Sequence, residues 1–357
     1  MKKIDGILLS VIVLLSLFGL FMIYNASSVI ALRDFDDSYY YLKEQSVWML
    51  IGFCGLFFFT FFTHKKLYSF AVPLLVASII LLLLVFIPGL GINALGASRW
   101  INFHFFTLQP AEFVKLSLAI YLAAWFSSKE KGRLPAFLLL MGAVWLLVML
   151  QPDMGTASII LFEAAVVYFI SGGSVKHFVV LTPIMAVIGF LFIKAAPYRA
   201  ARLTSFLNID PTLSNVSYHT KQILIALGSG GLAGVGIGNS LQKYAYLPEN
   251  VTDSIFAIIA EETGFIGASI VVLLFSIVIW RGFVIAMTAK DPFGKLLAAG
   301  ITSFLGIQII INLFSMTALM PLTGVPLPFI SYGGSALIID LAAIGILLNI
   351  SQTRTHG

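Results

Sequence analysis

Ten long apolar stretches divide the chain, and they constrain its fold more than any other feature of the sequence. A bilayer core of ~30 Å is crossed by roughly 20 helical residues, and each stretch comes near that length, with Thr156–Ile170 the shortest. Backbone groups in lipid need partners within their own segment, which helices provide. The sequence therefore predicts an all-α polytopic membrane protein with about ten transmembrane helices, forming one domain over residues 1–357. The stretches are Ile7–Tyr24, Val47–Phe62, Phe70–Ile87, Pro110–Phe126, Leu134–Leu150, Thr156–Ile170, Phe178–Lys194, Ser254–Trp280, Leu296–Thr317 and Ser335–Ile350.

The composition excludes most other classes of protein. Of the 357 residues, 59% are hydrophobic and 10% are charged, whereas a soluble domain carries about 25% charge. This excludes a soluble enzyme and a disordered chain. The net charge of +5 indicates no nucleic-acid partner, because such a partner needs clustered basic charge on a wetted surface. Cys54, in an apolar stretch, is the single cysteine of the sequence. One cysteine cannot form a disulfide framework or a cysteine-based metal site.

The distribution of lysine and arginine predicts the orientation in the membrane. Lys2 and Lys3 precede the first stretch as in a signal peptide, but no small-residue cleavage pattern follows Tyr24, so we expect a retained anchor. With the N-terminus inside, 12 of the 21 basic residues fall in inner loops, and the short outer loops hold only Arg33, Lys43 and Arg99. Because cytoplasmic loops are enriched in basic residues, we expect both termini in the cytoplasm.

One predicted outer segment, residues 195–250, precedes the eighth span and is far longer than an ordinary connection of ~4–6 residues. It contains the apolar run Ile223–Leu227, two glycine-rich clusters and several cations. We expect it to be ordered, partly as short helices that lie on or dip into the outer leaflet. The chain shows no internal repeat of the kind that marks inverted-repeat transporters.

Glu112 and Lys115 are the first charges inside an apolar stretch. They lie three residues apart and so share one helix face. Ionisable groups in hydrocarbon are costly and are candidates for function. Mutual neutralisation that lets the helix insert is an equally good explanation, and the two explanations are compatible. Pro110 suits the first turn of a helix, which places the pair within about two turns of the outer surface.

A second group of carboxylates begins at the eighth stretch. Asp253 is expected at the outer membrane edge, either as a reacting group or, with Thr252, as one of two candidates for a helix cap. Glu261 and Glu262 lie ~12–14 Å deeper, and at least one of them needs a partner or a water-filled cavity.

The other acids in or between the spans have simpler explanations. Asp153 is typical of a turn between two spans. Glu163 and Asp340 fall in the middle of spans, where we expect them to find hydrogen-bond partners within the bundle.

The outer cations Arg199, Arg202 and Lys243, with their glycine-rich loops, suit an anionic substrate such as a pyrophosphate presented from the outer leaflet. Binding of lipid headgroups by the two arginines is at least as compatible with the composition. The last outer loop, Pro321–Ser335, holds three prolines and three glycines. Such irregular backbone persists at the membrane edge only where it is buried in protein or lines a cavity.

Six strings spread over nearly the whole chain resemble the SEDS family (shape, elongation, division, sporulation) of bacterial cell-wall proteins. They occur in the family's order at Gly96–Asn102, Gln109–Leu116, Gln151–Thr156, Tyr198–Thr204, Leu247–Ala257 and Pro326–Ser335. The string Gly236–Glu249 is more similar to the division branch, typified by FtsW, than to the elongation branch, typified by RodA.

This resemblance implies a peptidoglycan glycosyltransferase that polymerises lipid II on the outer face of the bacterial cytoplasmic (inner) membrane for septal wall synthesis. Its implied partners are a class B penicillin-binding protein, other divisome proteins and the lipid bilayer. Asp253 matches the family's catalytic carboxylate. A divalent cation, Mg or Mn, is the one cofactor considered, with its ligands unassigned. Matching positions place substrate contacts at Arg199, Arg202, Lys243, Glu112, Lys115, Gln109, Ser331 and Tyr332, and supporting roles at Glu261, Glu262 and Arg99.

The chain departs from the family's pattern at Ser254, Thr263 and Ala336, none of which is a proposed reacting group. The implied donor linkage is α and the product is β-1,4, so we expect a single inverting displacement with Asp253 as general base. The alternatives are a lipid II flippase and an elongation polymerase of the RodA type. The unusual polar loops fall mainly on the predicted outer face, which favours an enzyme over a transporter.

Overall fold

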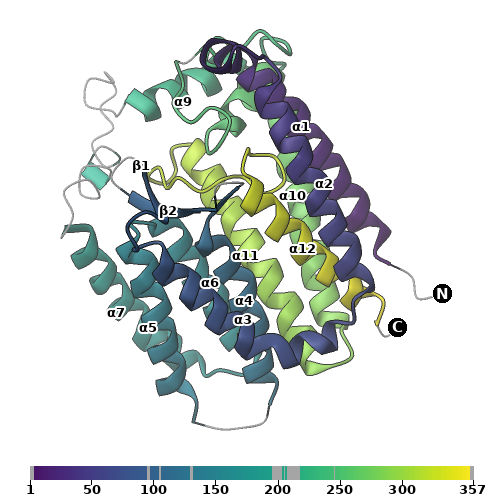
Figure 1. Ribbon diagram of the computed structural model, residues 1–357, viewed down its shortest axis with the longest axis vertical. Coiled ribbons are helices and arrows are strands. Elements are labelled where there is room, and N and C mark those ends of the chain that lie inside the picture. Colours follow the sequence, from purple (N-terminus) through teal and green to yellow (C-terminus); the bar gives the residue numbers. More distant parts are fainter. Residues whose placement is uncertain are drawn as a thin grey trace.

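The computed structural model describes residues 4–94, 97–103, 106–128, 132–194, 203–204, 206, 218–244 and 246–353. Within these residues the chain is predominantly helical, and each of the ten predicted stretches falls mainly on one helix, which confirms the predicted fold class (Figure 1). The helices are α1 (Gly6–Phe35), α2 (Tyr40–Phe61), α3 (His64–Leu84), α4 (Pro110–Ser127), α5 (Leu134–Leu150), α6 (Met154–Ile170), α7 (Val175–Lys194), α9 (Tyr218–Gly230), α10 (Ile255–Thr288), α11 (Pro292–Met316) and α12 (Gly334–Ser351).

Helix length and hydropathy fit a multi-pass membrane protein. Among the described residues, α1, α2, α3, α7, α10, α11 and α12 are long and apolar enough to cross a membrane, while α5 and α6 are shorter apolar helices. The remaining predicted span, α4, carries the charged residues Glu112 and Lys115. The extra helix, α9, has 13 residues and lies in the long segment before α10, where short helices were expected.

The centre of the bundle is formed by α11, which is buried over most of its length. It packs against α10, α4 and α6, and Figure 1 shows it in the middle of the molecule beside α12. Small residues permit this close packing: a Cβ on Gly300 would lie 3.1 Å from Val167 and 3.3 Å from Ala119. Small side chains at helix contacts are the usual means of association in membranes, where lipid removes the hydrophobic drive.

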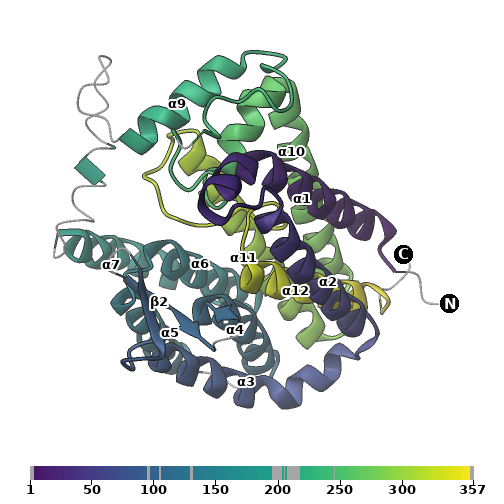
Figure 2. The ribbon, with the colours of Figure 1, turned by 45° about the horizontal axis from the view of Figure 1, so that its top comes forward.

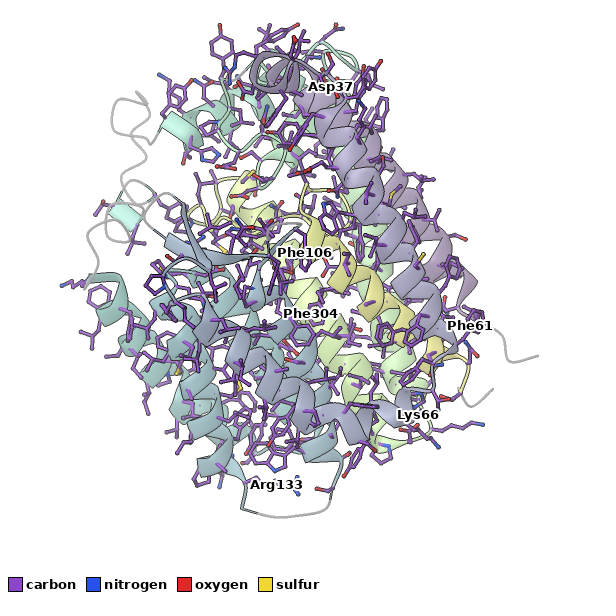
Figure 3. All side chains as sticks on the ribbon, in the orientation of Figure 1. Asp37, Phe61, Lys66, Phe106, Arg133 and Phe304 are labelled. Carbon is purple, nitrogen blue, oxygen red and sulfur yellow. The ribbon has the colours of Figure 1, made fainter. Side chains whose placement is uncertain are left out.

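Both ends of the described chain lie together, as an even number of spans requires (Figures 1 and 2). The backbone N–H of Asp5 donates to Ser351 Oγ at 3.2 Å, and Arg281 Nη2 donates to Asp5 Oδ2 at 2.5 Å. Lys66 lies toward this end of the bundle, and Asp37 lies at the opposite end (Figure 3). Lys66, predicted in an inner loop, and Asp37, predicted in an outer loop, therefore lie at opposite ends of the bundle (Figure 3), as the distribution of basic residues predicts.

A small antiparallel sheet, which is absent from the predicted fold, lies in the connection between α3 and α4. It has the order β1 (Gly91–Ala94), β2 (Ala97–Asn102) and β3 (Thr107–Leu108), and Gly91 pairs with Ile101. Its strands have two to six residues, too few for the alternation that identifies a half-buried strand in a sequence.

The eighth span is interrupted, although its apolar pattern predicts a continuous helix from Ser254 to Trp280. Helix α10 loses helical geometry at Gly264, where φ is 66° and ψ is −167°. The segment 231–236 fills this break. Two N–H groups after Gly264 donate to carbonyls of the segment, and two N–H groups of the segment donate to carbonyls before Gly264, over 2.9–3.2 Å. The broken helix therefore keeps its backbone groups paired, as a membrane segment must.

Candidate active site at the start of α10

Asp253 lies two residues before the first residue of α10, with its side chain partly exposed. Its carboxylate is beside the Pro321–Ser335 loop, because a Cβ on Gly324 would be 3.5 Å from Asp253 Oδ2.

The explanation of Asp253 or Thr252 as the helix cap of α10 is wrong. The N-cap of α10 is Ser254, without a side-chain capping bond, and Thr252 Oγ1 instead donates to Glu249 Oε2 at 2.8 Å.

The backbone around Asp253 is held from two directions. Asn312 Nδ2 donates to the carbonyl of Asp253 at 2.8 Å, and Ser331 Oγ donates to the carbonyl of Thr252 at 2.6 Å. The N–H of Tyr332 donates to the carbonyl of Val251 at 2.8 Å. Three consecutive carbonyls are thereby fixed, so the position of the carboxylate is set by α11 and by the last loop.

Ser331 and Tyr332, both predicted substrate contacts, make internal hydrogen bonds. Ser331 is buried and its Oγ also accepts the N–H of Leu327 at 2.8 Å. Tyr332 OH donates to Glu44 Oε2 on α2 at 2.5 Å. Burial, reinforced by the carboxylate of Glu44, raises the pKa of Tyr332 well above its ordinary value. These two side chains therefore hold the loop, and their predicted contact with substrate stays a prediction.

Glu112 and Lys115 form the ion pair that the sequence predicted, with 2.7 Å between Lys115 Nζ and Glu112 Oε2. Both side chains are buried, and Lys115 also donates to Gln308 Oε1 and lies 5.6 Å from the ring centroid of Phe304. Figure 3 shows Phe304 within the bundle. Gln308 Nε2 donates to the carbonyl of Pro326 at 3.1 Å. The pair thus reaches the last loop through a glutamine.

Glu163 on α6 and Asp340 on α12 are fully buried, and both interact electrostatically with Lys115. The expectation that they find hydrogen-bond partners is wrong for the described part of the chain, in which all four of their carboxylate oxygens lack one. The reason is their setting: the neighbouring α4 supplies one lysine, and that lysine is already bound to Glu112 and Gln308.

Glu261 and Glu262 both have partners, as the position of two carboxylates within a span predicts for at least one of them. Glu261 accepts a hydrogen bond from Ser240 Oγ, and Glu262 accepts one from Asn25 Nδ2. Lys243 Nζ lies 4.0 Å from Glu262 Oε1 and 3.4 Å from Asn25 Oδ1. The two carboxylates therefore anchor the segment after α9 beside the break in α10. Lys243 is buried in this anchor, and its predicted pyrophosphate contact stays a prediction.

Gln109 and Arg99 both bind the turn that precedes α6. Gln109 Nε2 donates to Asp153 Oδ2 at 3.2 Å, and Arg99 Nε donates to the carbonyl of Gln151 at 3.2 Å. Asp153, predicted as a turn residue, is the N-cap of α6. This turn packs on the last loop, because a Cβ on Gly155 would lie 3.2 Å from the carbonyl of Thr323. Arg99 and Gln109 therefore support the loop beside Asp253.

Two of the predicted site residues, Arg199 and Arg202, lie outside the described residues. Three neighbours of the site were not predicted. His219 Nε2 on α9 lies 2.8 Å from Ser254 Oγ, next to Asp253, and Gln308 and Asn312 join α11 to the last loop. The spacing of Gln308 and Asn312, four residues apart in an apolar stretch, is a signal that identifies a polar helix face.

This arrangement defines a class of protein: a polytopic helical membrane protein with a carboxylate fixed at the start of an interrupted helix. The chain belongs to the cell cycle protein family of FtsW, RodA and SpoVE, whose pattern it matches over residues 6–356. It is 41% identical to stage V sporulation protein E of Bacillus subtilis (strain 168), over 98% of this chain and 97% of the relative. It is 39% identical to a probable peptidoglycan glycosyltransferase FtsW of Geobacter sp. (strain M18), over the full length of both.

Solved structures show the same fold. The chain superposes with a TM-score of 0.81 and 27% identity on a chain from a peptidoglycan synthase complex that coordinates polymerization and crosslinking, over 98% of both chains. It superposes with a TM-score of 0.72 and 28% identity on the rod shape determining protein RodA of Thermus thermophilus, over 99% of both. The resemblance stated from the six strings is confirmed.

Proposed function

We propose that the protein is a peptidoglycan glycosyltransferase that polymerises lipid II into β-1,4 glycan strands on the outer face of the bacterial cytoplasmic membrane, for septal wall synthesis. The observation that carries the proposal is the placement of Asp253. Its side chain is partly exposed beside Gly324, while the backbone around it is fixed by Asn312 and Ser331. A general base needs this combination of access and fixed position.

In the proposed reaction the growing glycan on undecaprenyl pyrophosphate is the donor, and the sugar 4-hydroxyl of an incoming lipid II is the acceptor. The Asp253 carboxylate takes the hydroxyl proton as the 4-oxygen attacks the anomeric carbon of the donor sugar. Undecaprenyl pyrophosphate leaves from the opposite side of that carbon. Inversion of the α linkage yields the β product in one displacement. General-base catalysis of this kind contributes typically ~10²–10⁴-fold. Arg199 and Arg202 are proposed to stabilise the departing pyrophosphate.

The dependence on a divalent cation stays a prediction. In the described part of the chain, no group of three or more His, Cys, Asp or Glu side chains is placed so as to hold a metal ion. The proposal therefore assigns no step to a metal. Polymerisation measured with a chelator, and again after Mg or Mn is added back, tests the dependence on a divalent cation.

The buried charges favour an enzyme over a lipid II transporter. Glu112, Lys115, Glu163 and Asp340 are each at most 2% exposed, whereas a transport pathway needs charged groups that open to each side in turn. The proposed partners are a class B penicillin-binding protein, which supplies the transpeptidase, and other divisome proteins. The similarity to a chain of a peptidoglycan synthase complex supports the first of these.

The test is polymerisation of purified lipid II by the nearly isosteric variant Asp253→Asn. We expect its rate to fall by at least ~100-fold. The matched control is Asp36→Asn, because Asp36 is exposed and has a left-handed φ of 55°, which asparagine tolerates. Polymerisation by Asp253→Asn near the wild-type rate contradicts the general-base role. Movement of lipid II across liposomes without glycan formation supports the transporter instead.

A further inference from the structure

Two buried amides on α11 face the loop beside Asp253. Gln308 and Asn312 are at most 1% exposed and lie one helical turn apart on the same face. Their side-chain nitrogens donate to consecutive carbonyls of the loop: Asn312 to Val325 at 2.8 Å and Gln308 to Pro326 at 3.1 Å. The loop residue next to this pair, Gly324, is the one beside the Asp253 carboxylate.

Each amide has a second partner on a different element. Asn312 Nδ2 also donates to the carbonyl of Asp253 at 2.8 Å. Gln308 Oε1 accepts from Lys115 Nζ, the cation of the buried ion pair on α4. The orientation of both amides is fixed, because carbonyls only accept hydrogen bonds and an ammonium only donates them. Lys115 is thereby connected to the backbone of Asp253 in two steps, through Gln308 to the carbonyl of Pro326 and through Asn312 from the adjoining carbonyl of Val325.

We propose that Gln308 and Asn312 are positioning residues that hold Asp253 in its reacting place and couple it to the buried pair of Glu112 and Lys115. This inference rests on the proposed function. The physical reason is that Asn312 holds the Asp253 backbone and the loop with one nitrogen, so a shift of either one moves the other. A misplacement of ~1 Å at a reacting group costs roughly 100-fold in rate.

The first test compares Asn312→Leu with Ser303→Ala by measuring kcat and KM for lipid II. Ser303 is buried on the same helix, and its Oγ donates to the Ala299 carbonyl one turn earlier at 2.6 Å. We expect Asn312→Leu to lower kcat about 10–100-fold, with KM within about twofold and Ser303→Ala unchanged in both. Rates are taken per molecule of folded protein, recovered as a single species in detergent.

Gln308→Glu supplies an independent measurement if Asn312→Leu fails to fold. Glutamate keeps an oxygen for Lys115 but removes the donor to Pro326, so its kcat should fall toward that of Gln308→Met. A second measurement compares Glu112→Gln/Lys115→Met in the presence and absence of Gln308→Met. Coupling predicts that the pair substitution has a smaller effect on kcat when Gln308 is already replaced.

The outcomes separate the two proposals. If Gln308→Glu and any folded Asn312 variant keep the wild-type kcat while Asp253→Asn is inactive, the positioning role is wrong and the general base stands. If Asp253→Asn is itself active, the proposed site is wrong. If Glu112→Gln/Lys115→Met lowers kcat by the same factor in the wild-type and in the Gln308→Met background, the coupling is wrong.

Discussion

The backbone of Gly264 meets the backbone of Gly234 so closely that a Cβ on Gly264 would overlap Gly234 N. This contact is the point where the segment after α9 enters the break in α10. The break lies two residues after Glu262, whose Oε1 lies 4.0 Å from Lys243 Nζ of the segment after α9, and Glu261 accepts a hydrogen bond from Ser240 Oγ of that segment. The interruption of α10 and the two adjacent carboxylates therefore belong to one local structure.

Replacing Gly264 with alanine should destabilise the protein. The φ of 66° with ψ of −167° is a conformation adopted almost only by glycine, worth about 1–3 kcal/mol of strain for other residues, and the added Cβ collides with backbone. The measurement is the midpoint of thermal unfolding in detergent. The control is Gly142→Ala in α5, where a Cβ meets nothing within 4 Å and alanine is favoured by about 1 kcal/mol. Equal midpoints for the two variants would falsify this account of the break.

Removing one partner of the buried ion pair should be costly. Lys115→Met leaves Glu112 as an unpaired charge in the bundle, and breaking a buried pair in this way typically costs about 3–5 kcal/mol. The double variant Glu112→Gln/Lys115→Met removes both charges and should recover part of that loss. Unfolding midpoints of the single and double variants check this. A double variant less stable than either single variant contradicts it.

Neutral replacements at Glu163 and Asp340 should behave in the opposite way. Their carboxylates lack a hydrogen-bond partner within the described residues, and both compete for the lysine that is already bound to Glu112. Glu163→Gln and Asp340→Asn keep the shape and remove the charge, so we expect unfolding midpoints equal to or above that of the wild type. Glu112→Gln is the matched comparison and should lower the midpoint. A large loss of stability in Glu163→Gln would show that this carboxylate is compensated.

The sequence predicted the helices well because lipid imposes a simple length and hydropathy rule. The stretch Leu134–Leu150 coincides with α5, and Pro110 begins α4 as a first-turn proline should. The ion pair of Glu112 and Lys115 was also predictable, since a spacing of three residues on a helix nearly dictates the contact. In each case the information is local in the chain.

The rest of the site depends on contacts between distant segments. The break at Gly264 is filled by residues 231–236. A single glycine in an apolar stretch does not indicate which distant segment will hydrogen-bond to the helix there. The sequence could not identify Ser254 rather than Thr252 or Asp253 as the N-cap of α10, because all three residue types cap helices. Asn312 joins Asp253 across 59 positions, a pairing that periodicity alone cannot supply.

A pH dependence is expected at the end of the bundle that carries the termini, where Asp291 caps α11. Asp291 Oδ2 accepts the N–H of Gly294 at 2.8 Å, and Oδ1 lies 3.1 Å from Nε2 of the buried His64. Burial acts to raise the pKa of Asp291, but the bonds from Gly294 and His64, with the charge of Lys65, outweigh it and lower the pKa below its ordinary value.

The sign follows from linkage. A carboxylate whose pKa is lower in the folded state stabilises the protein above its unfolded pKa, and loses that contribution as the pH falls through the folded value. The unfolded value is about 4, so the loss occurs below pH ~4. Asp291→Asn isolates the charge, because asparagine caps helices as well as aspartate does. We expect the wild type to have the higher unfolding midpoint at pH 6, and the difference from Asp291→Asn to shrink as the pH falls from ~4 to 3. A difference that stays constant over this range contradicts a role for the Asp291 charge.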